Sequence, residues 1–291
     1  MRRRRLKIHG LSQQLYLWGS PKLPPLFLLH GWLDTGAGFE FLAQFLAKKF
    51  HCIAPDLRGY GQSEHAKSQL GYFFYEYVAD LHELFAKLSP KRPVRVLGHS
   101  LGGMVASIYA GTFPERVSEL INVEGYLNPG RKAEIAPDRA RAWIEGFGRQ
   151  RFRAFKSLEA FAARLQTSNP RLPADRALFL AKHLAKRVRG AWTMAADPNH
   201  KLLDPYWLPR EAHFAVWARI QARCLLVSAE KTEMALRFGE ADFAAEKDLL
   251  ESRFPAGTAK AEIPDCGHMA HHEKPEALAA LVLDFLRPKG S

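Results

Sequence analysis

Cysteine is scarce in this chain of 291 residues: it has three, Cys52, Cys224 and Cys266, which lie far apart in the sequence. An odd number of widely separated cysteines does not fit the disulfide framework of a small secreted protein. Two of them also fall inside or beside short apolar segments. The sequence therefore predicts reduced thiols and a cytoplasmic protein.

Long apolar runs and metal-binding spacings are missing as well. No apolar run comes near the roughly 20 residues that a membrane-spanning helix needs. No spacing of cysteine and histidine is typical of a zinc site. Met1 and four arginines resemble the start of a signal peptide, but the mixed segment 6–10 follows them, so we interpret them as the basic start of a first strand. We expect no transmembrane segment, no metal and no organic cofactor.

Positive charge is unevenly distributed. The net charge is +12, and residues 126–212 hold seventeen Lys and Arg against eight Asp and Glu. Solvated helix faces explain such an excess, and so does attraction to an anionic substrate, a membrane surface or nucleic acid. No nucleic-acid motif accompanies it, so we expect no nucleic-acid partner. We expect a small-molecule substrate and favour an anionic or amphiphilic one. The sequence carries no signal for an oligomeric state.

Strand and helix patterns alternate along most of the chain. Short apolar segments predict strands at 6–9, 14–18, 26–29, 52–54, 94–97, 117–123, 224–228 and 260–263. Apolar residues at helical spacing predict helices at 39–48, 72–88, 101–112, 235–250 and 275–286. This order predicts an α/β fold: a mostly parallel eight-stranded sheet with helices on both faces. Ligands bind beyond the carboxyl ends of the strands in such sheets.

The alternation stops between Val123 and Cys224. Helices are predicted there at 138–147, 152–165 and 175–188, with proline-containing turns between them. We predict a core formed by residues 1–125 and 213–291, and a helical cap formed by residues 126–212. The sequence does not identify which of the cap's aromatic residues face a cavity: Trp143, Phe147, Phe152, Trp192, Tyr206 or Trp207.

Residues 98–103 read Gly-His-Ser-Leu-Gly-Gly, between the predicted strand 94–97 and the predicted helix 101–112. A serine hydroxyl is a poor nucleophile unless it stands clear of the backbone, near a base and an N–H that stabilises an oxyanion. A sharp strand-to-helix turn achieves this, and Gly98 and Gly102 leave room for the turn. The sequence therefore predicts Ser100 as a nucleophile.

Three further motifs lie on either side of this turn in the sequence: residues 30–32 (His-Gly-Trp), 56–63 (Asp-Leu-Arg-Gly-Tyr-Gly-Gln-Ser) and 266–268 (Cys-Gly-His). Over nearly its whole length the chain resembles capped members of the α/β-hydrolase fold family. It is similar in detail to serine-hydrolase-like proteins, and to haloalkane dehalogenases in the part after Val123. Dehalogenases and epoxide hydrolases need an aspartate where Ser100 stands, which disfavours those activities.

The resemblance implies roles for the residues that match its motifs. His268 stands where the family's general base follows the last strand, and it would take and return the proton of Ser100. The N–H groups of Leu101 and Trp32 would form the oxyanion hole.

The other histidines and charged residues in these motifs have structural interpretations. We expect His271 and His272 to be solvated residues at a helix start. We expect His99 to pack beside the turn and His30 to stabilise its own loop. Asp56 and Arg58 are expected to lock the loop after residues 52–54 through hydrogen bonds and an ion pair.

The third member of the triad departs from the common pattern. Most relatives carry an aspartate where this chain has Thr232, which cannot hold the negative charge that stabilises an imidazolium. We favour Glu124, because it ends a buried strand beside a glycine and a carboxylate there needs a partner. The segment also resembles a branch of haloalkane dehalogenases with its acid at that place. Glu233 is the second choice; Glu230, Asp265 and a dyad without an acid remain open.

The sequence thus predicts a serine hydrolase, most simply a carboxylesterase or lipase-like enzyme with a Ser-His-Glu triad. Hydrolysis of a carbon–carbon bond in a diketone is the alternative reaction, since it uses the same triad and fold. A non-catalytic binding protein of the same fold is the alternative of another class, which the displaced acid favours.

Overall fold

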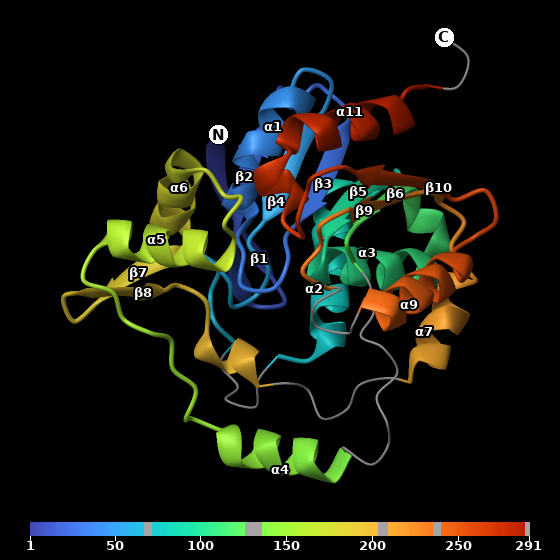
Figure 1. Cartoon of the computed structure of the whole chain (residues 1–291). Helices are drawn as coiled ribbons and strands as arrows, with labels where there is room; N and C mark the ends of the chain where they lie inside the picture. Colours follow the sequence, from blue (N-terminus) through green and yellow to red (C-terminus); the bar gives the residue numbers. More distant parts are fainter. Residues whose placement is uncertain (67–71, 126–135, 203–208, 235–239, 289–291) are drawn as a thin grey trace.

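The computed structural model describes residues 1–66, 72–125, 136–202, 209–234 and 240–288 (Figure 1). Its main sheet has eight strands, in the order β1 (Arg2–Ile8), β2 (Leu11–Trp18), β4 (His51–Pro55), β3 (Pro25–Leu29), β5 (Val94–His99), β6 (Val117–Val123), β9 (Arg223–Ala229) and β10 (Ala259–Ile263). The β1–β2 and β2–β4 pairs are antiparallel and the other pairs are parallel. The predicted sheet of eight mostly parallel strands is confirmed.

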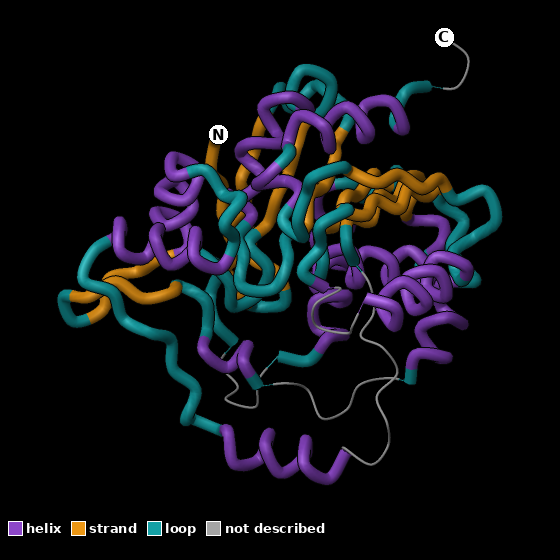
Figure 2. Tube along the Cα trace, in the orientation of Figure 1, coloured by secondary structure: helices purple, strands orange, loops and turns teal. Residues whose placement is uncertain are grey.

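Helices cover both faces of the sheet (Figures 1 and 2). One face carries α1 (Glu40–Leu46), α10 (Ala270–Glu273) and α11 (Pro275–Phe285); the other carries α2 (Phe74–Leu88), α3 (Leu101–Thr112), α7 (Arg210–Trp217) and α9 (Glu240–Ser252). Neighbouring residues of β3 pack against helices on opposite faces of the sheet. Phe27 packs into the apolar cluster under α2 and α3, and Leu28 into the cluster under α1 and α11. Side chains alternate along a strand, so an apolar run buries both faces.

The four arginines at the start belong to the edge strand β1, where they are exposed. Charged side chains on an edge strand discourage pairing with another chain. The three cysteines are free thiols inside the protein. Among the described residues, no helix combines the length and apolar character needed to cross a membrane.

Further elements lie between β6 and β9, outside the main sheet. The helices α5 (Leu158–Ser168) and α6 (Ala174–Leu184) pack around their own apolar cluster with the strands β7 (Ala185–Val188) and β8 (Ala191–Met194). The helix α4 (Ala136–Gly146) has no buried residue among those described and stands apart from the other elements in Figure 1.

Two of the helix predictions in this segment were wrong at one end. The helix predicted at 175–188 ends at Leu184, and β7 follows as half of a hairpin with β8. Arg189 and Gly190 turn this hairpin with φ of 48° and 83°, a pair of positive values typical of a two-residue turn. The helix predicted at 152–165 begins only at Leu158, because the Ser157 side chain caps it.

The aromatic cap residues are placed as follows. Trp143 and Phe147 contact each other, with ring centroids 4.4 Å apart. Phe152 lies under the Lys201 ammonium, and Trp192 pairs with the backbone of Phe155. Tyr206 and Trp207 lie outside the described residues, as does part of the helix predicted at 235–250.

The loops after β3 and β4 are fixed to each other by buried polar groups. His30 Nε2 accepts the Leu57 N–H at 2.9 Å, so its Nδ1 donates to the Gly31 carbonyl at 2.8 Å. Burial lowers the pKa of His30, which agrees with this neutral tautomer. The Asp56 carboxylate accepts from Thr35 Oγ1 at 2.6 Å and from the Gln62 N–H at 2.7 Å. These bonds hold the loop that begins with Trp32 in place.

Arg58 anchors the second loop to α2 rather than to Asp56. Its guanidinium makes two hydrogen bonds to Asp80, at 2.5 and 2.7 Å, and one to Glu76 at 2.5 Å. The Asp80 side chain is 3% exposed and the Glu76 side chain 37%. The buried carboxylate therefore carries the larger share of the anchoring.

We expect Asp80→Asn to lower the free energy of unfolding by on the order of 3 kcal/mol, because it removes one charge from a buried ion pair. Glu76→Gln is the matched control, and should cost less than about 1 kcal/mol because the Glu76 side chain is 37% exposed and water screens its charge. Urea unfolding followed by tryptophan fluorescence measures both. Equal losses would contradict this assignment of the anchor.

Candidate active site

Ser100 stands at the turn between β5 and α3, with φ 51° and ψ −117°. The backbone of a residue other than glycine is strained at this positive φ, and the surrounding structure keeps Ser100 in that conformation. A Cβ on Gly98 would lie 2.3 Å from the Gly102 carbonyl oxygen, and one on Gly102 would lie 2.3 Å from the Leu29 carbonyl oxygen. Only glycines permit this close packing of turn, helix and neighbouring strand. The turn has the geometry that the motif predicts.

Glu124 follows the next strand, β6, and also has a positive φ, of 55°. Its N–H donates to the Val227 carbonyl of β9 at 2.9 Å. The Asn122 side chain accepts from the Gly125 N–H at 2.8 Å and donates to Ser107 Oγ in α3 at 3.0 Å. The turn after β6 is therefore tied to both neighbours of the site, α3 and β9.

The Glu124 carboxylate is buried, 2% exposed as a residue, and hydrogen-bonded on both oxygens. Oε1 accepts the Ala229 N–H at 2.9 Å. Oε2 accepts the Thr232 hydroxyl and lies 3.2 Å from His268 Nδ1. An ionised carboxylate only accepts, so Nδ1 of His268 carries the proton and Nε2 is left as the basic nitrogen. Thr232, which the sequence singled out as standing in place of an aspartate, thus donates to Glu124.

The backbone of His268 is also held at both polar groups. Its N–H donates to Glu233 Oε2 at 2.9 Å. Its carbonyl accepts from Nε2 of His99 at 2.8 Å. His99 precedes Ser100 in the chain, so this bond joins the turn of the predicted nucleophile to the loop of the predicted base.

The remaining candidate acids are engaged elsewhere. Glu233 Oε1 pairs with Arg171 at 3.2 Å. Glu230 Oε2 accepts the Asp265 N–H at 2.8 Å, and the Asp265 carboxylate pairs with Lys274 at 3.1 Å. Among these candidates, Glu124 is the one whose carboxylate meets the His268 ring.

The two predicted oxyanion donors come from loops that meet at Ser100. Leu101 is the first residue of α3, where N–H groups lack intrahelical partners. A Cβ on Gly31, the neighbour of Trp32, would lie 3.2 Å from the Ser100 Cβ. The Trp32 indole, half exposed, donates to the His200 carbonyl at 3.1 Å. The structure thus brings the loop of Trp32 against the turn.

Sequence reasoning missed His200, which belongs to the short helix η4 (Pro198–Lys201). Its ring is stacked between Tyr60 and Tyr72, at centroid distances of 3.7 and 3.8 Å. Its Nδ1 lies 3.0 Å from the Tyr77 hydroxyl. This stack attaches residues 198–201 to the core beside Trp32. No local sequence pattern predicts this stack, because the partners of His200 come from distant segments.

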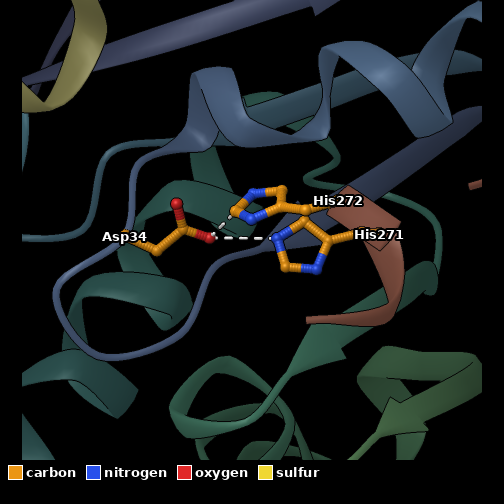
Figure 3. A group of neighbouring side chains, drawn as sticks. All are labelled: Asp34, His271 and His272. Atoms are coloured by element: carbon orange, nitrogen blue, oxygen red, sulfur yellow. Dashed lines mark hydrogen bonds and ion pairs between the residues drawn. The ribbon is translucent and has the colours of Figure 1, made fainter. Parts of the chain in front are cut away.

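The expectation that His271 and His272 are solvated is wrong. Their residues are 0% and 3% exposed, and their rings face the buried carboxylate of Asp34 (Figure 3). The short helix α10 carries them beneath α1, among the apolar residues of that face. His99, by contrast, packs beside the turn as expected, and burial holds its pKa well below the usual value.

Ser100, Glu124 and His268 follow β5, β6 and β10, and the Glu124–His268 contact and the His99–His268 bond bring the ends of these strands together. Sheet topology accounts for the meeting, since β5, β6, β9 and β10 are consecutive neighbours and end at the same edge.

Comparisons with known proteins agree with this architecture. The family model of the alpha/beta hydrolase fold matches residues 24–275. The chain is 27% identical over 283 residues to serine hydrolase-like protein 2 of Homo sapiens, covering 93% of this chain and 89% of that protein. It is 26% identical over 287 residues to 3-hydroxybutyrate-oligomer hydrolase of Cupriavidus necator, covering 93% and 92%.

Among solved structures, the thioesterase domain from the curacin biosynthetic pathway is similar at a TM-score of 0.85 and 25% identity, over 97% of this chain and 99% of that domain. The resemblance inferred from the motifs is confirmed. The chain belongs to the alpha/beta hydrolase fold family, and relatives that match most of its length are named serine hydrolase-like proteins.

Proposed function

We propose that this protein hydrolyses carboxylic esters through a triad of Ser100, His268 and Glu124. The observation that carries the proposal is the contact between the Glu124 carboxylate and His268 Nδ1, which leaves the other ring nitrogen as a base beside the loop of Ser100. In the proposed cap formed by residues 126–212, Arg171 supports the same loop through Glu233.

In the first step the Ser100 oxygen attacks the ester carbonyl carbon while His268 Nε2 takes the hydroxyl proton. The carbonyl oxygen becomes an oxyanion, to which the N–H groups of Leu101 and Trp32 donate. When the tetrahedral intermediate collapses, the bond to the alcohol breaks and His268 gives the proton to the leaving oxygen. Glu124 stabilises the imidazolium that exists between these transfers.

In the second step water attacks the acyl-enzyme, and His268 Nε2 accepts a proton from it. Collapse releases the carboxylic acid and returns the proton to the Ser100 oxygen. Ester and water balance the reaction, so the route uses no metal or organic cofactor.

An ester that carries a negative charge fits the chain best. The basic excess of residues 126–212 favours anionic substrates over neutral ones. A relative along nearly the whole chain is named for hydrolysing 3-hydroxybutyrate oligomers, which are esters with a terminal carboxylate. We therefore propose short acyl esters with a free acid group as the substrate class.

A fluorophosphonate probe tests the nucleophile. Wild-type protein should form a covalent adduct on Ser100 with loss of fluoride, and folded Ser100→Ala should form none; mass spectrometry of the peptides locates the adduct. A panel of p-nitrophenyl esters and one ring-cleavage diketone then tests the bond that is broken. Absence of an adduct on folded wild-type protein would favour a non-catalytic binding protein, and turnover of the diketone alone would favour carbon–carbon bond hydrolysis.

Glu124→Gln should lower kcat by roughly 10³-fold or more, because an amide neither stabilises the imidazolium nor fixes the tautomer. Glu233→Gln is the matched control: it touches the backbone N–H of His268 and should lower kcat by less than about tenfold, a barrier change below about 1.4 kcal/mol. Steady-state ester hydrolysis measures both.

The same assay allows a rescue. Thr232 donates to the Glu124 oxygen that contacts His268, so an aspartate at position 232 replaces the missing charge near the ring. Thr232→Asp should restore at least about tenfold of the kcat lost in Glu124→Gln, roughly 1.4 kcal/mol of the barrier. A severe loss in Glu233→Gln with none in Glu124→Gln would overturn the assignment of the acid.

Two p-nitrophenyl esters of equal acyl length, one neutral and one ending in a carboxylate, test the substrate class. The charged ester should have the higher kcat/KM at low ionic strength. The difference should shrink as salt shortens the screening length from about 10 Å at 0.1 M towards about 3 Å at 1 M. The neutral ester is the control for salt effects on the protein. Equal values of kcat/KM at every salt concentration would remove the anionic preference.

A further inference from the structure

Asp34, His271 and His272 bring three metal-binding groups together outside the proposed triad (Figure 3). Asp34 Oδ2 lies 3.0 Å from His271 Nε2 and 3.6 Å from His272 Nε2. One ligand atom from each residue lies within 4.8 Å of the other two. All three residues are buried. The cluster comes from the loop after β3 and from α10.

Internal hydrogen bonds do not satisfy this cluster. Asp34 Oδ1 and His272 Nε2 are both buried, and neither has a hydrogen-bond partner within the described part of the chain. Leaving a buried polar atom unpaired costs about 1–3 kcal/mol, more for a charged group. Two such atoms in one cluster point to a ligand that would satisfy both.

The backbone of Gly38 packs directly against these two atoms. A Cβ at position 38 would lie 2.7 Å from His272 Nε2, 2.9 Å from Asp34 Oδ1 and 3.3 Å from Asp34 Oδ2. Its φ lies outside the range that favours glycine, so close packing rather than backbone conformation explains the residue. A side chain at position 38 would crowd the unpaired oxygen and the unpaired nitrogen.

We propose that Asp34, His271 and His272 form a site for a divalent transition-metal ion, with zinc as the probe. Zinc bonds of about 2.0–2.2 Å in a tetrahedron put neighbouring ligand atoms about 3.3–3.6 Å apart, close to the two separations at Asp34 Oδ2. Imidazole ligands favour zinc, copper, nickel and cobalt over magnesium and calcium. Because the cluster is buried, binding requires local opening and should be slow.

The site lies behind the proposed catalytic histidine. The His271 ring is 4.4 Å from the His99 ring, and His99 Nε2 donates to the His268 carbonyl. A metal on His271 Nε2 moves that ring's proton to Nδ1, on a buried nitrogen beside His99. Metal binding should therefore disturb the position of His268 and slow turnover. This consequence rests on the proposed ester hydrolysis, whereas the metal site itself does not.

Cobalt(II) tests the site without reference to activity. Ser100→Ala protein incubated with cobalt should develop the visible absorption of a tetrahedral complex, at one ion per chain, and excess zinc should remove it. His272→Gln deletes one ligand, and Gly38→Ala places a methyl group against Asp34 Oδ1 and His272 Nε2, so both should lose the signal. His9→Gln is the matched control, because His9 is an exposed histidine paired with a carboxylate, Glu83. It should keep the signal.

Thermal unfolding with and without zinc shows whether each variant is folded. Zinc should raise the Tm of Ser100→Ala protein and leave the Tm of its His272→Gln variant unchanged. No cobalt spectrum, or equal spectra in His272→Gln and the starting protein, would overturn the metal site. In wild-type protein, zinc should lower kcat by at least about fivefold after slow onset. Unchanged kcat at full occupancy would overturn the link to His268.

Discussion

The contact between Glu124 and His268 governs the arrangement of the site. A carboxylate at the end of a central strand loses its hydration, which costs several kcal/mol unless other groups replace the water. The Ala229 N–H, the Thr232 hydroxyl and the His268 ring supply that replacement. The same bonds fix which nitrogen of His268 carries the proton. One interaction thus stabilises the buried charge and leaves Nε2 of His268, the proposed base, without the proton.

Strain and packing are linked around this contact. Ser100 and Glu124, at the ends of adjacent strands, both have positive φ. Each such residue costs on the order of 1–3 kcal/mol, and it persists only where the surroundings determine its conformation. The Asn122 side chain joins the two turns by bonding to α3 on one side and Gly125 on the other. The sheet therefore holds Ser100 and Glu124 in conformations that short peptides would not keep.

Local pattern was enough to predict the core of this fold. Residues 94–103 combine an apolar strand, two obligatory glycines and a small-residue helix, and they fold as the motif predicts. The mostly parallel sheet with helices on both faces also followed from the alternation of strands and helices, whereas the order of the strands came from the structure. Glu124 could be nominated because a carboxylate at a strand end needs a partner, and the structure places His268 there.

The rest depends on contacts that no local pattern encodes. His271 and His272 lie in a four-residue helix that α1 covers. Their polar residue type alone predicted exposure to solvent, because the covering helix is distant in the sequence. The hairpin of β7 and β8 was hidden because helical spacing ran on through Val188; the turn at Arg189 and Gly190 was the signal that opposed it. The sequence showed that Thr232 replaces the usual aspartate. Its hydrogen bond to Glu124 could not be predicted, because it forms only when β6 and β9 lie side by side.

A crystal structure of the phosphonylated protein tests the central claim most directly. Phosphorus should be bonded to the Ser100 oxygen, with a phosphoryl oxygen facing the N–H groups of Leu101 and Trp32, and His268 Nδ1 should lie within hydrogen-bond distance of Glu124. Phosphorus on another residue, or a His268 ring paired with a different carboxylate, would contradict the account.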